Sequence, residues 1–189
     1  SSNAAVGQDA PLVRVELLRN FAGFSMPPTP VPAAAFIPAD QQALRIFGSA
    51  VFTTKTITQS SPTQGGTNSI TVSLQPSVDL SGDYAAVTIS GVLGASTPSG
   101  VVRVYGPDSV LFASTGAWEQ KSGALVLLLA SGQTLPSALV STITFDLTNP
   151  LEPRPSPDQV LIWATGSVPI AASPMVVAAG GGLPLKVDS

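Results

Sequence analysis

The sequence contains no cysteine and no histidine, and only 10% of its 189 residues are charged. Without cysteine the chain has no disulfide, no thiolate nucleophile and no thiolate metal ligand. Without histidine it lacks the side chain that most often serves as a general base near neutral pH or binds transition metals. These absences exclude most catalytic centres and all His/Cys metal sites. They predict a protein whose side chains serve packing and contacts.

Positive charge is also scarce. Eight Lys and Arg residues stand against eleven Asp and Glu, which gives a net charge of −3, and the basic residues are scattered singly. Nucleic acids and anionic membrane surfaces attract clustered positive charge, so neither is an expected partner. The longest dense apolar run, 124–130, is far shorter than the roughly 20 residues that a membrane-spanning helix needs, so we expect no membrane insertion.

Alternation of apolar and hydroxylated residues dominates the middle of the chain. Ile70, Val72 and Leu74 alternate with serines and threonines, and 87–90 and 142–148 show the same pattern. A period of two places apolar side chains on one face of a strand and polar ones on the other, as in an antiparallel sheet that is buried on one side. Further strands are predicted, mostly from β-branched residues, at 12–18, 51–58, 101–105, 125–129 and 160–163. A helix over 12–21 is the only helical alternative.

Turn-forming sequences separate these strands, and the chain holds 18 prolines and 17 glycines. Seven or more strands without helical periodicity between them predict an all-β, immunoglobulin-like antiparallel β-sandwich, with an open barrel as the alternative. Segments 26–38 and 168–184 are rich in proline or glycine and predict extended, polyproline-like flanks. The predicted organisation is an N-terminal flank over 1–50, a sandwich domain over 51–175 and a C-terminal extended segment over 176–189.

The two flanks are similar to each other. Residues 29–31 followed by 43–46 are similar to residues 173–175 followed by 184–187. Either this similarity is chance, or the chain holds the end of one repeat, a whole repeat and the start of the next, as a piece of a tandem array would.

An ordered series of short motifs runs through 53–175. It comprises TITQSSP at 56–62, NSITVSL at 68–74, VDL at 78–80, VTISGVLGA at 87–95, GAW at 116–118, SGALVL at 122–127 and FDLTNP at 145–150. In this order the motifs resemble a repeat domain of very large secreted or surface proteins of algae, oomycetes and other protists. The resemblance implies a β-sandwich building block of extracellular coats, hairs or adhesive arrays, and it brings no catalytic residues to carry over.

Two acidic residues flank a glycine turn. Asp79 and Asp83 lie on either side of Gly82, and calcium sites in extracellular β-domains use such carboxylates. The alternative is a turn in which an aspartate accepts hydrogen bonds from neighbouring backbone N–H groups. We expect the turn, with no bound metal and no cofactor.

Two tryptophans are candidate contact residues. Trp118 and Trp163 could each pack in the core, stack on a sugar or contact a neighbouring domain, because large aromatic side chains serve in all three settings. Serines and lysines are present, but no lysine lies in an apolar stretch that would lower its pKa, and no carboxylate pair has a recognisable context. We therefore expect a protein that is not an enzyme.

The expected function is structural. The chain is expected to be an extracellular or cell-surface module that associates with copies of itself or with neighbouring repeats when a strand adds to an open sheet edge. The residues expected to take part lie in the two flanks: Leu12, Val13 and Val15 at the N-terminus, and Leu183, Leu185 and Val187 at the C-terminus. A carbohydrate-binding module with glycan partners, and a virion or capsid protein, are the alternatives.

Overall fold

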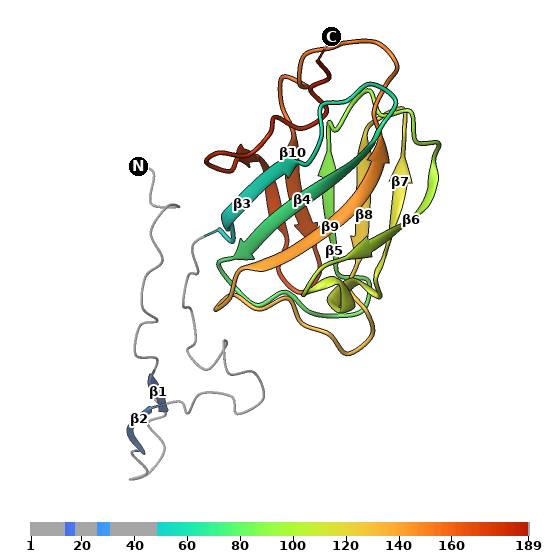
Figure 1. Ribbon diagram of the computed structural model, residues 1–189. Coiled ribbons are helices and arrows are strands. Elements are labelled where there is room, and N and C mark those ends of the chain that lie inside the picture. The colour runs from blue at the N-terminus through green and yellow to red at the C-terminus, as the bar shows by residue number, and fades with distance from the viewer. Residues whose placement is uncertain (1–13, 18–25, 31–48, 189) are drawn as a thin grey trace. The chain divides into compact units, whose positions relative to one another are not determined.

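The computed structural model describes residues 14–17, 26–30 and 49–188 (Figure 1). The described residues form β-strands and one short 3₁₀-helix, with no α-helix, so the all-β prediction is confirmed. The chain divides into two units, Ser1–Ser49 and Ala50–Ser189. None of the helices in the described ranges has the length and apolar character that crossing a membrane requires.

The first unit contains a two-stranded antiparallel sheet. Strand β1 (Arg14–Leu17) pairs with β2 (Met26–Pro30), and the register shifts between Val15 and Leu17. The strand predicted over 12–18 is therefore confirmed for 14–17, while Leu12 and Val13 lie outside the described residues. The polyproline-like linker predicted over 26–38 is wrong for Met26–Pro30, because these residues pair with β1.

The second unit holds ten strands in one mixed sheet. Their order in the sheet is β11-β10-β5-β8-β7-β6-β9-β4-β3-β12. The strands are β3 (Phe52–Gln59), β4 (Thr67–Pro76), β5 (Ala86–Ser90), β6 (Gly100–Tyr105), β7 (Thr115–Glu119), β8 (Ala124–Leu128), β9 (Ser141–Thr148), β10 (Leu161–Thr165), β11 (Ile170–Pro174) and β12 (Val176–Val177). The 3₁₀-helix η2 (Ser109–Phe112) lies between β6 and β7.

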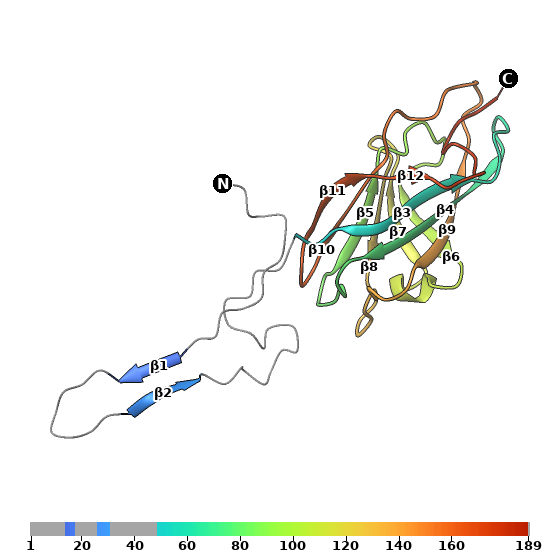
Figure 2. The same cartoon turned by 90° about the vertical axis from the view of Figure 1, so that its left-hand side faces the viewer.

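The sheet folds over on itself because two stretches of chain change partners. The first four residues of β6 pair with β7, and its last two, Val104 and Tyr105, pair with β9. On the other side β11 pairs with β10, and β12 pairs in parallel with β3, with only Met175 between them (Figure 2). The Met175 N–H donates to the Val160 carbonyl at 2.8 Å. The result is a nearly barrel-shaped unit whose two sheet layers face each other.

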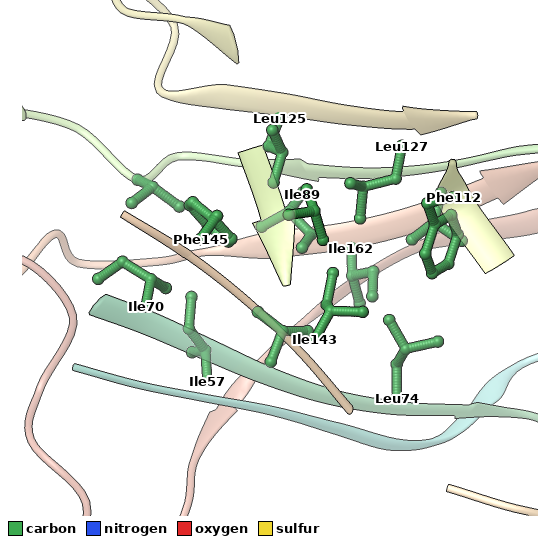
Figure 3. Close-up of a cluster of buried hydrophobic side chains, with 14 of the residues drawn as sticks. Ile57, Ile70, Leu74, Ile89, Phe112, Leu125, Leu127, Ile143, Phe145 and Ile162 are labelled. Carbon is green, nitrogen blue, oxygen red and sulfur yellow. The ribbon is translucent and has the colours of Figure 1, made fainter. Parts of the chain in front are cut away.

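The core lies between these layers, where the predicted alternation places it. Ile70, Val72 and Leu74 of β4 are fully buried, as is Phe145 of β9. Figure 3 shows side chains of the β4–β9 layer, such as Ile70, facing those of the opposite layer, such as Leu125 and Leu127. Fully burying a side chain of this size contributes about 1.5–3 kcal/mol, so the alternating strands provide most of the stability.

Besides β2, three strands of the second unit were not predicted from the sequence: β7, β11 and β12. Strand β7 (TGAWE) carries a glycine whose added Cβ would lie 2.7 Å from Leu125 Cδ1, so close packing requires Gly116 and weakens the strand signal. Strands β11 and β12 fall in segment 168–184, which was predicted as an extended flank. That prediction is wrong for Ile170–Val177, because these residues pair with β10 and β3.

The Phe145→Ala substitution should lower the free energy of unfolding by about 3–5 kcal/mol, because it leaves a cavity in the middle of the core. Thr148→Ala, an exposed position in the same strand, should stay within about 0.5 kcal/mol of the unsubstituted protein. Urea unfolding curves of both variants measure this difference. Equal losses in the two variants would contradict the assigned core.

Candidate functional site

The outer face of the β10-β5-β8-β7-β6 layer carries a central row that is apolar apart from Thr88. One row of register partners crosses all five strands: Trp163, Thr88, Val126, Ala117 and Val101. Val101 is 79% exposed, Ala117 is exposed, and Trp163 and Val126 are half-buried. We call this row the apolar face. Beside it a groove of about 310 Å³ is lined by Val101, Val126 and Leu128, among others.

The outer face of the other layer has the opposite chemistry. Along β4 and β9, the hydroxyl of Thr71 lies 3.2 Å from that of Thr144, and the hydroxyl of Ser73 lies 3.0 Å from that of Thr142. These paired hydroxyls form a solvated ladder of the kind that antiparallel sheets present to water. The two outer faces of one fold therefore differ in polarity.

Opposite charges flank the apolar face on β6 and β7. Arg103 lies two residues from Val101 and opposite Thr115, whereas Glu119 lies two residues from Ala117 in the other direction. Both charged residues are exposed. The Glu119 carboxylate is held in place at Oε1, which accepts hydrogen bonds of 3.1 Å from the Ser99 hydroxyl and the Lys121 N–H. A negatively charged side chain, Glu119, and a positively charged one, Arg103, therefore lie on either side of an uncharged centre.

The two predicted tryptophans occupy different environments. Trp118 is only 3% exposed, and its Nε1–H donates to the Thr97 carbonyl at 3.0 Å. Its ring packs in the core, so it presents no surface for a sugar or a partner. Trp163 is half-buried on the apolar face, opposite Thr88 of β5.

Residues 183–187, which are predicted to add as a strand to a neighbouring unit, pack within their own unit instead. Leu185 is fully buried and Val187 is 3% exposed. The main chain of Val187 exchanges two hydrogen bonds with Arg154, at 3.1 and 2.9 Å. These residues therefore belong to the same packed unit rather than to an extended tail, and of the three predicted contact residues Leu183 alone is exposed, at 47%.

The N-terminal donor is paired as well, because Val15 lies in β1 opposite Thr29 of β2. The sheet of the second unit ends in β11, whose one ladder runs to β10, and in the two-residue strand β12, whose one ladder runs to β3. Strand β11, IAASP, carries no charged residue, and Pro174 at its end removes one backbone donor from the edge, so strand addition is open over 170–173.

Asp79, one of the two acidic residues considered for calcium, forms hydrogen bonds within the protein. Asp79 Oδ1 accepts hydrogen bonds of 2.7 Å from both the N–H and the hydroxyl of Ser137. These bonds, the backbone one first, hold the pKa of Asp79 below its usual value. Within the described ranges no three Asp or Glu side chains come together as a metal site would need. Asp79 therefore connects its own turn to Ser137 in the loop before β9.

Two buried asparagines form a network that the sequence does not reveal. Asn68 and Asn149 are fully buried. Asn68 Nδ2 donates to Asn149 Oδ1 at 2.8 Å, and Asn149 Nδ2 donates to the carbonyls of Ser61 and Thr63 at 2.9 and 2.8 Å. The network fixes the loop between β3 and β4 against the end of β9. Its one sequence signal is the Asn149–Pro150 step at the end of a strand.

A second cluster joins three strands on the hydroxylated side. The Tyr105 hydroxyl donates to Asp146 Oδ1 at 2.5 Å, and the Ser69 hydroxyl donates to the same oxygen at 2.7 Å. Burial, and then the Asp146 carboxylate, raises the pKa of Tyr105. Through these hydrogen bonds the cluster joins β4, β6 and β9.

The chain matches no model of a known protein family and no curated protein.

The Asn149→Ala substitution should lower the free energy of unfolding by about 1–3 kcal/mol, because it leaves the carbonyls of Ser61 and Thr63 without their buried donor. Asn149→Asp has the same shape but sets a carboxylate oxygen against those carbonyls, so its loss should be at least as large. Thr67→Ala, at an exposed position nearby, is the control. The free energy of unfolding of each variant is measured in urea. If Asn149→Ala loses no more of it than the control does, the network has no structural role.

Stability should fall at acid pH in part through Asp79. Since its pKa is lower in the folded protein than in the unfolded chain, its contribution is present above the unfolded pKa of about 3.9 and is lost as the pH falls below that value. Asp79→Asn should therefore give a shallower loss of stability between about pH 5 and pH 2. Thermal unfolding midpoints over this range test this, and parallel curves for the two proteins would contradict it.

Proposed function

We propose that this chain is a non-enzymatic assembly module of an extracellular coat, filament or adhesive array, built on an immunoglobulin-like sandwich plan. Its proposed partner is a second copy of the same chain, which binds through the apolar face. The observation that carries the proposal is that face itself: a row five strands wide with no charged residue and with Val101 79% exposed.

Burial of apolar surface drives this association. Contiguous exposed apolar surface is uncommon on proteins that function alone, and it marks binding surfaces. Covering Val101, Ala117 and Val126 with a partner removes that surface from water at about 25 cal/mol per Å². The hydroxylated face of the β4–β9 layer stays in solvent and keeps the assembly soluble.

The flanking charges favour a two-fold arrangement of the copies. A two-fold axis through the central pair, Val101 and Ala117, reverses the order of residues along β6 and β7 in the second copy. Arg103 of each copy then faces Glu119 of the other. Two favourable pairs form without any contact between like charges, so the surface is complementary to itself.

The open edge of β11 offers a second contact, through which a strand from a neighbouring unit would extend the sheet. Face pairing closes a dimer, and edge addition would continue it into an array. The resemblance of 53–175 to repeat domains of secreted protist proteins supports the extracellular placement of such an array.

The test is the association of the full chain, measured by sedimentation velocity over a wide range of protein concentration. The unsubstituted protein should form a dimer, and Val101→Asp should weaken dimerisation by at least tenfold, because it buries an unpaired charge. Leu139→Asp, at a loop position that is 67% exposed, should leave the dimer unchanged.

Charge reversal distinguishes the two contacts. Arg103→Glu should weaken the dimer, and Arg103→Glu with Glu119→Arg should restore it. Ala171→Lys combined with Ala172→Lys, which adds two charges to β11, should leave the dimer intact. A chain that stays monomeric at high concentration, or that loses its dimer through the β11 lysines alone, would contradict face pairing.

A further inference from the structure

A pocket of about 470 Å³ lies between two loops at the end of strand β8. One loop is 81–84, before β5, and the other is 129–134, after β8. The volume falls within the range of roughly 300–1,000 Å³ that is typical of small-molecule sites. The pocket shares Leu128 with the groove beside the apolar face and Asp83 with the calcium prediction, but neither feature accounts for the pocket as a whole.

Hydrogen bonds hold both walls of the pocket in place. At one end Leu80 and Leu135, both fully buried, exchange two main-chain hydrogen bonds of 3.0 and 2.9 Å. At the other end the Leu129 N–H donates to the Ala85 carbonyl at 2.8 Å. Ser81 is fixed in addition, because its carbonyl accepts the N–H of Ser167 at 3.0 Å. The pocket is therefore preorganised, and binding would require little ordering of its walls.

Tyr84 stands at this pocket in an unfavourable conformation. Its φ is +66°, a left-handed value that bulky residues rarely adopt, and its side chain is 89% exposed. The left-handed backbone costs stability, and exposure of the ring recovers none of it through burial. Strain of this kind is retained where the surrounding structure enforces it, and it is concentrated at binding sites.

Four polar side chains of the pocket are open to solvent. Within the described part of the chain, the side chains of Asp83, Ser131, Gln133 and Thr134 are exposed and make no hydrogen bond to the protein, so a ligand would replace water at these groups. Together they offer hydroxyls, an amide and one carboxylate. No Lys or Arg lines the pocket, so an anionic ligand would meet only the negative charge of Asp83.

We propose that this pocket binds a neutral saccharide. A pyranose ring has an apolar C–H face and a rim of hydroxyls. The rigid, amphipathic ring of Tyr84 would pack against that apolar face, and Asp83 and Gln133 would receive and donate hydrogen bonds at the rim. Leu128 and Leu129 supply apolar contact on the other side.

The experiment uses the ¹⁵N-labelled full chain and three uncharged probes: cellotetraose, chitotetraose and mannotetraose. At least one probe should shift the amide resonances of 81–84 and 130–134 in a saturable manner. Tyr84→Ala should weaken that binding at least tenfold, whereas Tyr84→Phe should retain it, because the ring face and not the hydroxyl makes the contact. Trp163→Ala, on the apolar face, is the matched aromatic control and should bind normally.

Tyr84→Gly separates function from stability. Glycine adopts a left-handed φ without strain, so this variant should unfold at a higher temperature than the unsubstituted protein while losing the sugar. If no probe shifts these resonances, or if Tyr84→Ala binds as tightly as the unsubstituted chain, the saccharide site is wrong. Either result leaves the proposed dimer untouched, since sedimentation measures that contact independently.

Discussion

The structure depends on the closure of one sheet by stretches of chain that change partners. β6 leaves β7 for β9, and the chain leaves β10 for β3 across Met175. Both sheet layers thereby turn one face inward, and every alternating strand can bury its apolar side. In the described residues the inner faces carry the hydrophobic core, and the candidate surfaces lie on the outer faces, the edges and the loops.

The outer faces of the two sheet layers differ in chemistry. The β4–β9 layer presents paired hydroxyls, as in Thr71 and Thr144, which interact well with water. The opposite layer presents the apolar face, centred on Val101 and Ala117 and flanked by Arg103 and Glu119. The loop pocket beside Tyr84 lies at the end of this second layer. The proposed self-association and saccharide binding would therefore use neighbouring surfaces of this layer, which meet at Leu128.

Local sequence patterns predict the strands with a strong period of two, such as 70–74 and 142–148, because alternation depends only on neighbouring residues. They do not predict β11 or β12, whose residues become strands through partners far away in the chain. The same limit applies to the sites. Trp118 and Trp163 look alike in sequence, yet one is buried and the other lies on the surface. The apolar face itself exists only through cross-strand register, and Tyr84 stands out only through its backbone conformation.

Cross-linking tests the central claim, self-association through the apolar face, most directly, because the chain has no cysteine of its own. Val101→Cys would place a single thiol beside the proposed two-fold axis, and a bis-maleimide with a spacer of about 10 Å matches the separation of packed sheets. The account predicts a covalent dimer from this variant and none from Leu139→Cys in the exposed loop before β9. Equal cross-linking of both variants, or none from Val101→Cys at concentrations where the chain is dimeric, would contradict it.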